Sequence, residues 1–443
     1  MNEPLVFGDL VGPDREPTVD EERELLEPLA REGEAEASTV SMGRSNAADD
    51  PGPILTRDAE GWRAGRYVGE LRRAGHVLEI RPRLGVETLA SWAAAALGVR
   101  TVVRAAEHRG TAALIAEIMA ASWRSALVDA ARHGPPGIRR PRPHRGLAAK
   151  GRIDVPATLR LRQGGRSQLA SISRPRAVDN PITRAIVCAD RVLNRRLARE
   201  GWRGDRVAEL MPRLWSATGQ RPKLPTRRDL DRVRFTPITL PYKRVAELSH
   251  QIASNKGLRA QASAESAEGF LIDVAELWEL FLLHCARRAF PGEARHGTRD
   301  GDADYLLSSV SPPGRRLGKL LPDLILGPPS RPWAILDAKY KPLAGRRGVD
   351  REDLYQLTSY MSADAGRGEA FGALLYPEFG DNPGEPPAYE GRPWELRSGQ
   401  RVTFERVAVT EATAISQLRS LGRSMGANSA QAQKPRAKVA VTD

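Results

Sequence analysis

Two acidic residues and a lysine lie close together in the segment LPDLILGPPSRPWAILDAKYKP, which spans residues 321–342. Asp323 opens the apolar run DLILG, while Asp337 and Lys339 lie at the end of the second run, AILDAKY. Side chains two positions apart in a strand point to the same face, so Asp337 and Lys339 should be neighbours. The intervening Gly-Pro-Pro-Ser predicts a turn that pairs the two runs as an antiparallel hairpin and brings Asp323 nearby.

These three residue types are suited to the hydrolysis of a phosphodiester. Two converging carboxylates fit Mg²⁺, with Mn²⁺ as an alternative, because Mg²⁺ is usually held by one or two carboxylates together with water and substrate phosphate oxygens. Such a metal lowers the pKa of a bound water, and Lys339 would orient that water or stabilise charge on the phosphate. The competing interpretation is an ordinary core hairpin with charged, solvated ends.

The sequence around the hairpin predicts an α/β core. Residues 269–290 are expected to form a long, mostly buried helix before it, and residues 350–361 a helix after it. The β-rich patterns that follow predict two further strands, at 371–377 and 401–409.

Four more residues in these elements are candidates for the site. Gln356 and Tyr360 are four positions apart and share one helix face, where they would either face the site and DNA or pack in the core. Glu279 lies in the apolar sequence LWELFLL, and an unpaired buried acid is costly, so it should have a site role or an arginine partner. Lys341 would contact a phosphate or form the solvated end of its strand.

The N-terminal half has a different character. Residues 65–85 predict a hairpin that ends at Pro82, and helical spacing follows at 87–99 and 111–132. Residues 153–161 have a strand-like pattern, and 180–200 predict an amphipathic helix, with Asn180 as N-cap and Pro181 at its first position.

The positive charge of the chain is concentrated in its middle. The net charge is +13, yet residues 139–244 contain 27 Lys and Arg against 8 Asp and Glu, so the rest of the chain is net acidic. Arginine-rich segments bind phosphate oxygens and release counterions, so this segment would either bind a nucleic acid or form a solvated basic surface. The arginines along 184–199 would bind DNA, contact acidic residues of a partner protein, or simply be solvated.

Other chemistries have little support in the sequence. Cys188 and Cys285 are isolated in apolar helices, which favours core packing and a reducing, cytoplasmic location. The seven histidines lack metal-ligand spacing, and His284 is expected to be a satisfied core residue. We find no secretory signal, no apolar run long enough for a membrane and no phosphate-binding Walker A sequence, so we expect neither membrane contact nor nucleotide binding by this chain.

The PD…DAK pattern, with its downstream Gln-x-x-x-Tyr helix, resembles the PD-(D/E)xK nucleases. The wider sequence resembles the McrC family, the nuclease subunits of McrBC-type, modification-dependent (type IV) restriction systems. The similar stretches occur in the order of the family and cover most of residues 65–380. They are 68–85, 145–159, 176–193, 271–281, 321–327, 335–341, 353–360 and 374–377.

The resemblance implies a fold and a set of site residues. The expected fold is a C-terminal restriction-endonuclease-like core, a mixed sheet flanked by helices, preceded by a β-rich N-terminal region and a basic helical middle region. Asp323, Asp337 and Glu279 would hold the metal, with Glu276 as a weaker alternative to Glu279, and Lys339 and Gln356 would complete the catalytic set. We expect four regions: an acidic, weakly ordered extension (1–60), a region for motor and DNA contact (61–255), the nuclease domain (256–423) and a disordered tail (424–443).

The resemblance also implies a function that depends on a partner. The chain would hydrolyse both strands of duplex DNA, bearing modified bases, when assembled with an McrB-like AAA+ GTPase translocase, and it would stimulate that motor. Two alternatives stay open: a catalytically idle DNA-binding adaptor that activates the motor, and a stand-alone DNA repair nuclease.

Overall fold

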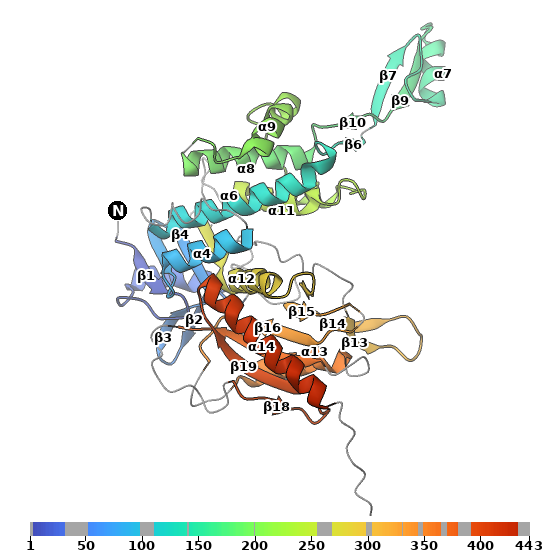
Figure 1. The fold of residues 1–443 in the computed structure, drawn as a ribbon. Helices are drawn as coiled ribbons and strands as arrows, with labels where there is room; N and C mark the ends of the chain where they lie inside the picture. The colour runs from blue at the N-terminus through green and yellow to red at the C-terminus, as the bar shows by residue number, and fades with distance from the viewer. Residues whose placement is uncertain are drawn as a thin grey trace, which may run out of the picture. The chain divides into compact units, whose positions relative to one another are not determined.

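The computed structural model shows a mixed α/β protein with mixed sheets (Figure 1). Among the described helices, none is both long enough and apolar enough to cross a lipid bilayer. The residues that the structure describes are 3–31, 52–97, 110–139, 141–198, 200–254, 268–297, 304–329, 331–343, 349–364, 370–379 and 391–432.

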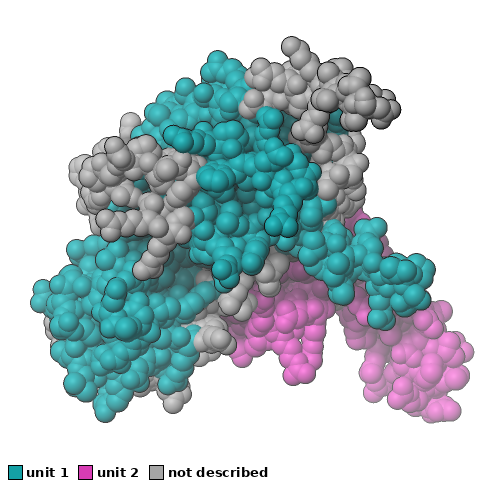
Figure 2. Space-filling view, turned by 90° about the horizontal axis from the view of Figure 1, so that it is seen from below, with its two compact units in different colours: residues 1–118, 264–443 teal, residues 119–263 magenta. Residues whose placement is uncertain are grey.

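The chain divides into two units, residues 1–118 together with 264–443, and residues 119–263 (Figure 2). These limits differ from the predicted boundaries at 60 and 255. The difference arises from strand pairing across a long stretch of sequence: β11 (Glu268–Asp273) lies antiparallel to β4 (Tyr67–Arg73) and so joins the segment after residue 264 to the N-terminal sheet.

The N-terminal sheet has the strand order β1-β5-β4-β11. The predicted hairpin is confirmed as β4 and β5 (His76–Arg81), and β5 ends directly before Pro82. Strand β1 (Leu5–Gly8) runs parallel to β5 and buries Leu5 and Phe7 in the core. Residues 5–8 are therefore ordered, although they belong to the segment that we predicted to be weakly ordered. The remaining elements near this sheet are α1 (Val19–Glu21), a π-helical turn (Glu22–Leu26), α2 (Glu27–Leu29), β2 (Leu55–Asp58) and β3 (Gly61–Ala64).

Gly69 allows β4 and β11 to approach each other closely. Its φ of +152° lies in the region that favours glycine, and an added Cβ would collide with the carbonyl oxygen of Phe270. The pairing that joins the two parts of this unit therefore requires a glycine at position 69.

The second sheet of this unit has six strands in the order β12-β15-β16-β17-β19-β18. Strands β16, β17 and β19 are parallel, while β15 is antiparallel to β16. The predicted strands at 371–377 and 401–409 are present. The bounds are β12 (Ala294–Arg295), β15 (Leu324–Leu326), β16 (Ala334–Ala338), β17 (Phe371–Pro377), β18 (Trp394–Glu395) and β19 (Arg401–Val407), with a separate hairpin of β13 (Asp304–Ser308) and β14 (Arg316–Leu320).

Helix α12 (Val274–Ala289) packs against α4 (Val86–Leu97), α14 (Glu411–Ala432) and β16, whereas α13 (Arg351–Asp364) contacts β16 and β17. The helix expected from residue 269 begins only at Val274, because Asp273 caps it by accepting from the N–H groups of Ala275 and Glu276.

The C-terminal region also differs from our prediction. Residues 424–432, expected to be part of a disordered tail, continue α14, with Met425 buried in the core. Residues 433–443 lie outside the described residues.

The second unit is mainly helical. Helix α8 (Pro181–Leu197) confirms the predicted amphipathic helix, and Asn180 caps it by accepting from the N–H of Thr183. The strand expected at 153–161 is instead mostly helix α7 (Val155–Gln163), which Asp154 caps. The other helices are α6 (Gly110–Ala130), whose residues from Met119 belong to this unit, a 3₁₀ turn (Ala131–His133), α9 (Asp205–Thr218), α10 (Arg227–Asp231) and α11 (Tyr242–Ser254).

A two-stranded ribbon connects these helices to a small sheet that α7 covers (Figure 1). The ribbon consists of β6 (Ile138–Arg139) and β10 (Arg176–Ala177), and the sheet of β7 (Arg142–Gly146), β9 (Leu169–Ser173) and β8 (Arg152–Ile153).

Candidate active site

The predicted hairpin is present as β15 and β16, in which Leu324 pairs with Leu336. One step further in the same register places Asp323 opposite Asp337, where antiparallel neighbours have their side chains on the same face. The Asp323 carboxylate accepts a hydrogen bond of 2.8 Å from the backbone N–H of Ala338. The hairpin therefore brings the two acids to the same end of the sheet.

Asp337 and Lys339 form a close ion pair. Lys339 Nζ lies 2.6 Å from Asp337 Oδ2, and the two side chains are 15% and 2% exposed. The strand period puts them on the same face as Ile335, which belongs to the core cluster that includes Leu357 of α13. Tyr340, on the opposite face, packs edge-on against Trp92 of α4. The alternation predicted from the sequence therefore directs the acid and the lysine toward α13.

Gln356 and Tyr360 extend this pair along α13. Lys339 Nζ donates to Gln356 Oε1 at 2.5 Å, and Gln356 Nε2 donates to the hydroxyl of Tyr360 at 2.8 Å. A continuous polar chain thus runs from Asp337 through Lys339 and Gln356 to Tyr360. This geometry fixes the direction in which the Lys339 ammonium points.

Asp353, which we did not single out in the sequence, is also part of the cluster. It is buried, lies 3.7 Å from Lys339 Nζ and 2.8 Å from Lys341 Nζ, and accepts from the hydroxyl of Tyr376 at 3.3 Å. Lys341 additionally pairs with Asp350 at 2.9 Å. The signal for Asp353 was present in DREDLYQ, because it precedes Gln356 by three positions and must share its helix face.

Burial and neighbouring charges shift both members of the central pair. Burial raises the pKa of Asp337, the Lys339 cation opposes that shift, and Asp353 and Glu279 add to it. Burial alone would lower the pKa of Lys339, but the carboxylates of Asp337, Asp323 and Asp353 outweigh it and raise the pKa. The site therefore gathers several acids around one buried cation.

Glu279, for which we expected a site role or an arginine partner, contacts a buried histidine. It is buried on α12, and its Oε1 lies 2.7 Å from Nε2 of the buried His296. Glu276 of the same helix is also buried.

The donor set fits a hard cation through two carboxylates. Within the described ranges, no group of three or more His, Cys, Asp and Glu side chains is arranged to hold a metal ion. Asp323 and Asp337 would supply oxygen ligands from adjacent strands, and water and phosphate oxygens would have to complete the shell of Mg²⁺. Of the residues that we expected to lie in the core, Cys188 and Cys285 are buried. Nε2 of His284 lies within hydrogen-bonding distance of Glu411 Oε1, at 2.9 Å.

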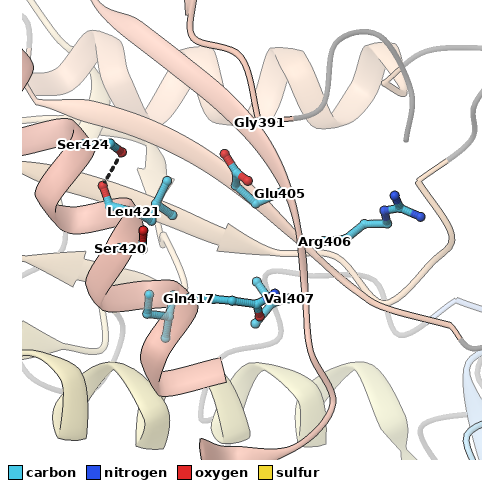
Figure 3. A pocket seen from close by; sticks show the side chains of 9 residues that line it. Gly391, Glu405, Arg406, Val407, Gln417, Ser420, Leu421 and Ser424 are labelled. Atoms are coloured by element: carbon cyan, nitrogen blue, oxygen red, sulfur yellow. Dashed lines mark hydrogen bonds between the residues drawn. The ribbon is translucent and has the colours of Figure 1, made fainter. Parts of the chain in front are cut away.

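A separate cavity of about 260 Å³ lies between β19 and α14 (Figure 3). Glu405 and Arg406 of the strand and Gln417 and Ser424 of the helix contribute to its lining. None of the predicted site residues lines it, so it gives no information on the hairpin chemistry.

The fold and the clustered acids and lysine define an α/β protein with a polar site on its six-stranded sheet. Residues 62–377 match the model of a family described as "McrBC 5-methylcytosine restriction system component". The chain belongs to this family. No curated protein matches it.

Solved structures of McrBC complexes are similar to the chain. The first is described as a refined half-complex from a tetradecameric assembly of Thermococcus gammatolerans McrB AAA+ hexamers with bound McrC. The match has 16% identity and a TM-score of 0.52, and it covers 96% of this chain and all of the other. The second is the T. gammatolerans McrBC complex, with 16% identity and a TM-score of 0.39, covering 65% of this chain and 88% of the other.

Proposed function

We propose that this chain is the DNA-cleaving subunit of its restriction system, an Mg²⁺-dependent endonuclease of the PD-(D/E)xK type. The observation that carries the proposal is the Asp337–Lys339 pair at 2.6 Å at the C-terminal end of β16, with Asp323 nearby, directly before β15. Membership of the McrBC family adds the biological setting, in which the substrate is duplex DNA with modified bases.

In this proposal, Asp323 and Asp337 would hold Mg²⁺, which would supply positive charge to the phosphate and a bound water of lowered pKa. Lys339 donates to that water or to the attacked phosphate, since an ammonium has three N–H donors and no acceptor. The hydrogen bonds of Gln356 with Lys339 and with Tyr360 would hold the Lys339 ammonium in this orientation. Glu279, paired with His296, would support the site through its charge, which acts on Asp337.

The proposal includes a partner with motor activity. The similar structure is described as McrB AAA+ hexamers with bound McrC, and the structural match covers 96% of this chain. We infer that this chain likewise joins an AAA+ GTPase, stimulates it and receives DNA from it. The sequence has no Walker A motif of its own, which agrees with a motor on a separate chain.

The test is plasmid cleavage by the chain together with its cognate motor, GTP and Mg²⁺. Asp337→Asn keeps the volume of the buried side chain but removes its charge, and we expect cleavage to fall at least a thousandfold, close to the limit of detection, while stimulation of GTP hydrolysis persists. Asp58→Asn is the matched control, because Asp58 is an acid that is half exposed in the β2–β3 hairpin.

Three other outcomes would change the assignment. Equal cleavage by the wild type and Asp337→Asn would place the chemistry elsewhere. Stimulation of the GTPase without any cleavage by the wild type would favour the adaptor. Cleavage by the chain alone, with neither motor nor GTP, would favour a stand-alone nuclease.

A further inference from the structure

The second unit contains an arginine-lined pocket to which neither the family match nor the proposed chemistry assigns a role. The pocket has a volume of about 690 Å³, within the usual range for small-molecule sites. It lies among α8, α9 and the residues that follow each helix. The residues that matter for its chemistry are Arg191, Asn194, Arg195, Trp215 and Arg221.

One side of the pocket is formed by an ion pair between Asp190 and Arg203. Asp190 is 1% exposed, and both of its oxygens accept from the guanidinium of Arg203, at 2.5 and 3.0 Å. The guanidinium carbon of Arg203 also lies 4.8 Å from the ring centroid of Trp202 and 5.7 Å from that of Trp215. A bidentate pair flanked by two indoles is held in one geometry, so the only carboxylate of the pocket lining is already neutralised.

The other three arginines of the pocket lining carry charge that no carboxylate of the described residues offsets. Arg191 and Arg195 are four positions apart on α8, and Arg221 follows α9. Among the described residues, no carboxylate forms an ion pair with any of these three side chains. Asn194, between the two α8 arginines, accepts from the indole N–H of Trp202 at 3.0 Å and is thereby fixed. Three unpaired guanidinium groups around one pocket repel each other, and a bound polyanion would relieve that repulsion.

We propose that this pocket binds the phosphodiester backbone of a DNA strand. Guanidinium groups match phosphate oxygens bidentately, and Arg191 and Arg195, as neighbours on one helix face, would engage successive phosphates. Trp215 would receive a sugar or base, since indole surfaces stack on nucleotides irrespective of sequence. The pocket residues belong to the segment 139–244, whose basic excess would add to the attraction for a polyanion.

A polynucleotide fits better than an acidic peptide. A row of carboxylates would satisfy the arginines but would make no stacking contact with the partly buried ring of Trp215. The inference rests on the proposed function in one respect, namely that DNA is the polynucleotide this chain meets. It does not require that the chain cuts the DNA, so the two ideas can fail separately.

The experiment measures binding of the full chain to a fluorescent 30-base-pair duplex and to its single strand, in EDTA and over a range of salt concentrations. The test variant is Arg191→Gln/Arg195→Gln. The matched control is Arg206→Gln/Arg213→Gln, which removes the same charge from exposed positions of α9 outside the pocket lining. Glutamine preserves helix propensity in both variants, and circular dichroism verifies their folding.

We expect the pocket variant to bind DNA at least tenfold more weakly at about 100 mM salt. The slope of log K against log salt should fall by about 1 to 2, which corresponds to the loss of one or two phosphate contacts. The control should keep the slope of the wild type. Comparison of the duplex with the single strand identifies the form of DNA that the pocket accepts.

Two results would overturn the proposal. Equal losses in the pocket and control variants would mean that the attraction is diffuse. A poly-glutamate peptide of matched charge that binds the wild type as tightly as DNA, and loses the same affinity in the pocket variant, would identify an acidic protein partner instead. Asp337→Asn should retain DNA binding by the pocket while it loses cleavage, which separates failure of this inference from failure of the nuclease proposal.

Discussion

The hydroxyl of Tyr340 donates a hydrogen bond of 2.7 Å to the carboxylate of Asp9, across 331 positions of sequence. Asp9 follows β1, is completely buried, and also accepts from the backbone N–H of Arg83 at 2.5 Å. Burial raises the pKa of Asp9, and the hydrogen bonds from Arg83 and Tyr340 oppose that shift. Tyr340, the residue after Lys339, is thus bonded to a residue that follows β1 of the N-terminal sheet. Both sheets of this unit therefore hold the segment that follows β16 in place.

Replacement of Tyr340 by phenylalanine should destabilise this unit without abolishing the chemistry. The loss of a hydrogen bond to a buried carboxylate is expected to cost about 1.5–3 kcal/mol. Cleavage measured well below the unfolding temperature should persist, because Tyr340 points away from the Asp337 face. Chemical denaturation checks the first expectation, with Tyr305→Phe as the control, since no described residue hydrogen-bonds the Tyr305 hydroxyl.

The contact between Gln356 and Lys339 predicts a positioning role for the glutamine. Gln356→Ala should lower the turnover rate by about 10–100-fold, as is usual for groups that orient a catalytic side chain. The apparent KM for DNA and the thermal midpoint should change little. Thr358→Ala, at an exposed position of the same helix, is the control. A higher apparent KM together with a lower thermal midpoint would instead indicate that Gln356 contributes only to packing.

The sequence predicted local features of the site well because they depend on short periodicities. The strand period placed Asp337 beside Lys339, and the helix period placed Gln356 above Tyr360. The same helix period applied to Asp353, but we missed it. Its role depends on an ion pair with Lys341, a contact between two elements that the helix period alone does not predict. The β4–β11 pairing could not be predicted, since it joins segments about two hundred residues apart through a close approach at Gly69.

The carboxylate of Asp323 should determine the Mg²⁺ concentration that cleavage requires. Asp323→Asn keeps a side-chain oxygen that can accept from Ala338 but removes one anionic ligand, so we expect the Mg²⁺ concentration for half-maximal cleavage to rise by about 10–100-fold. EDTA should abolish cleavage by the wild type, and added Mg²⁺ or Mn²⁺ should restore it. Cleavage that survives EDTA would exclude the assigned role of both carboxylates.

Glu279 allows a direct comparison with Asp323. Its carboxylate is bonded to His296, so Glu279→Gln should shift the Mg²⁺ dependence much less than Asp323→Asn. An equal shift in the two variants would make Glu279 a direct ligand, as the resemblance implied.

The ion pair between Arg15 and Glu21 predicts a pH dependence of stability. The Arg15 guanidinium, at 2.6 Å, lowers the pKa of Glu21 to about 2 against burial, and the Thr18 hydrogen bonds contribute. A carboxylate whose folded pKa is depressed stabilises the fold above its unfolded pKa of 4.5 and loses this contribution as the pH falls toward 2. Because the Arg15 side chain is 35% exposed, solvent screening limits the contribution to about 1–2 kcal/mol.

Glu21→Gln should therefore be less stable than the wild type by that amount at pH 7, and the difference should shrink between pH 4.5 and pH 2. Denaturant titrations of both proteins at several pH values measure it. Asp129→Asn, which breaks the exposed pair with Arg132, should change stability by less than about 0.5 kcal/mol at pH 7. A difference for Glu21→Gln that stays constant down to pH 2 would mean that packing, and not the charge of Glu21, carries its contribution.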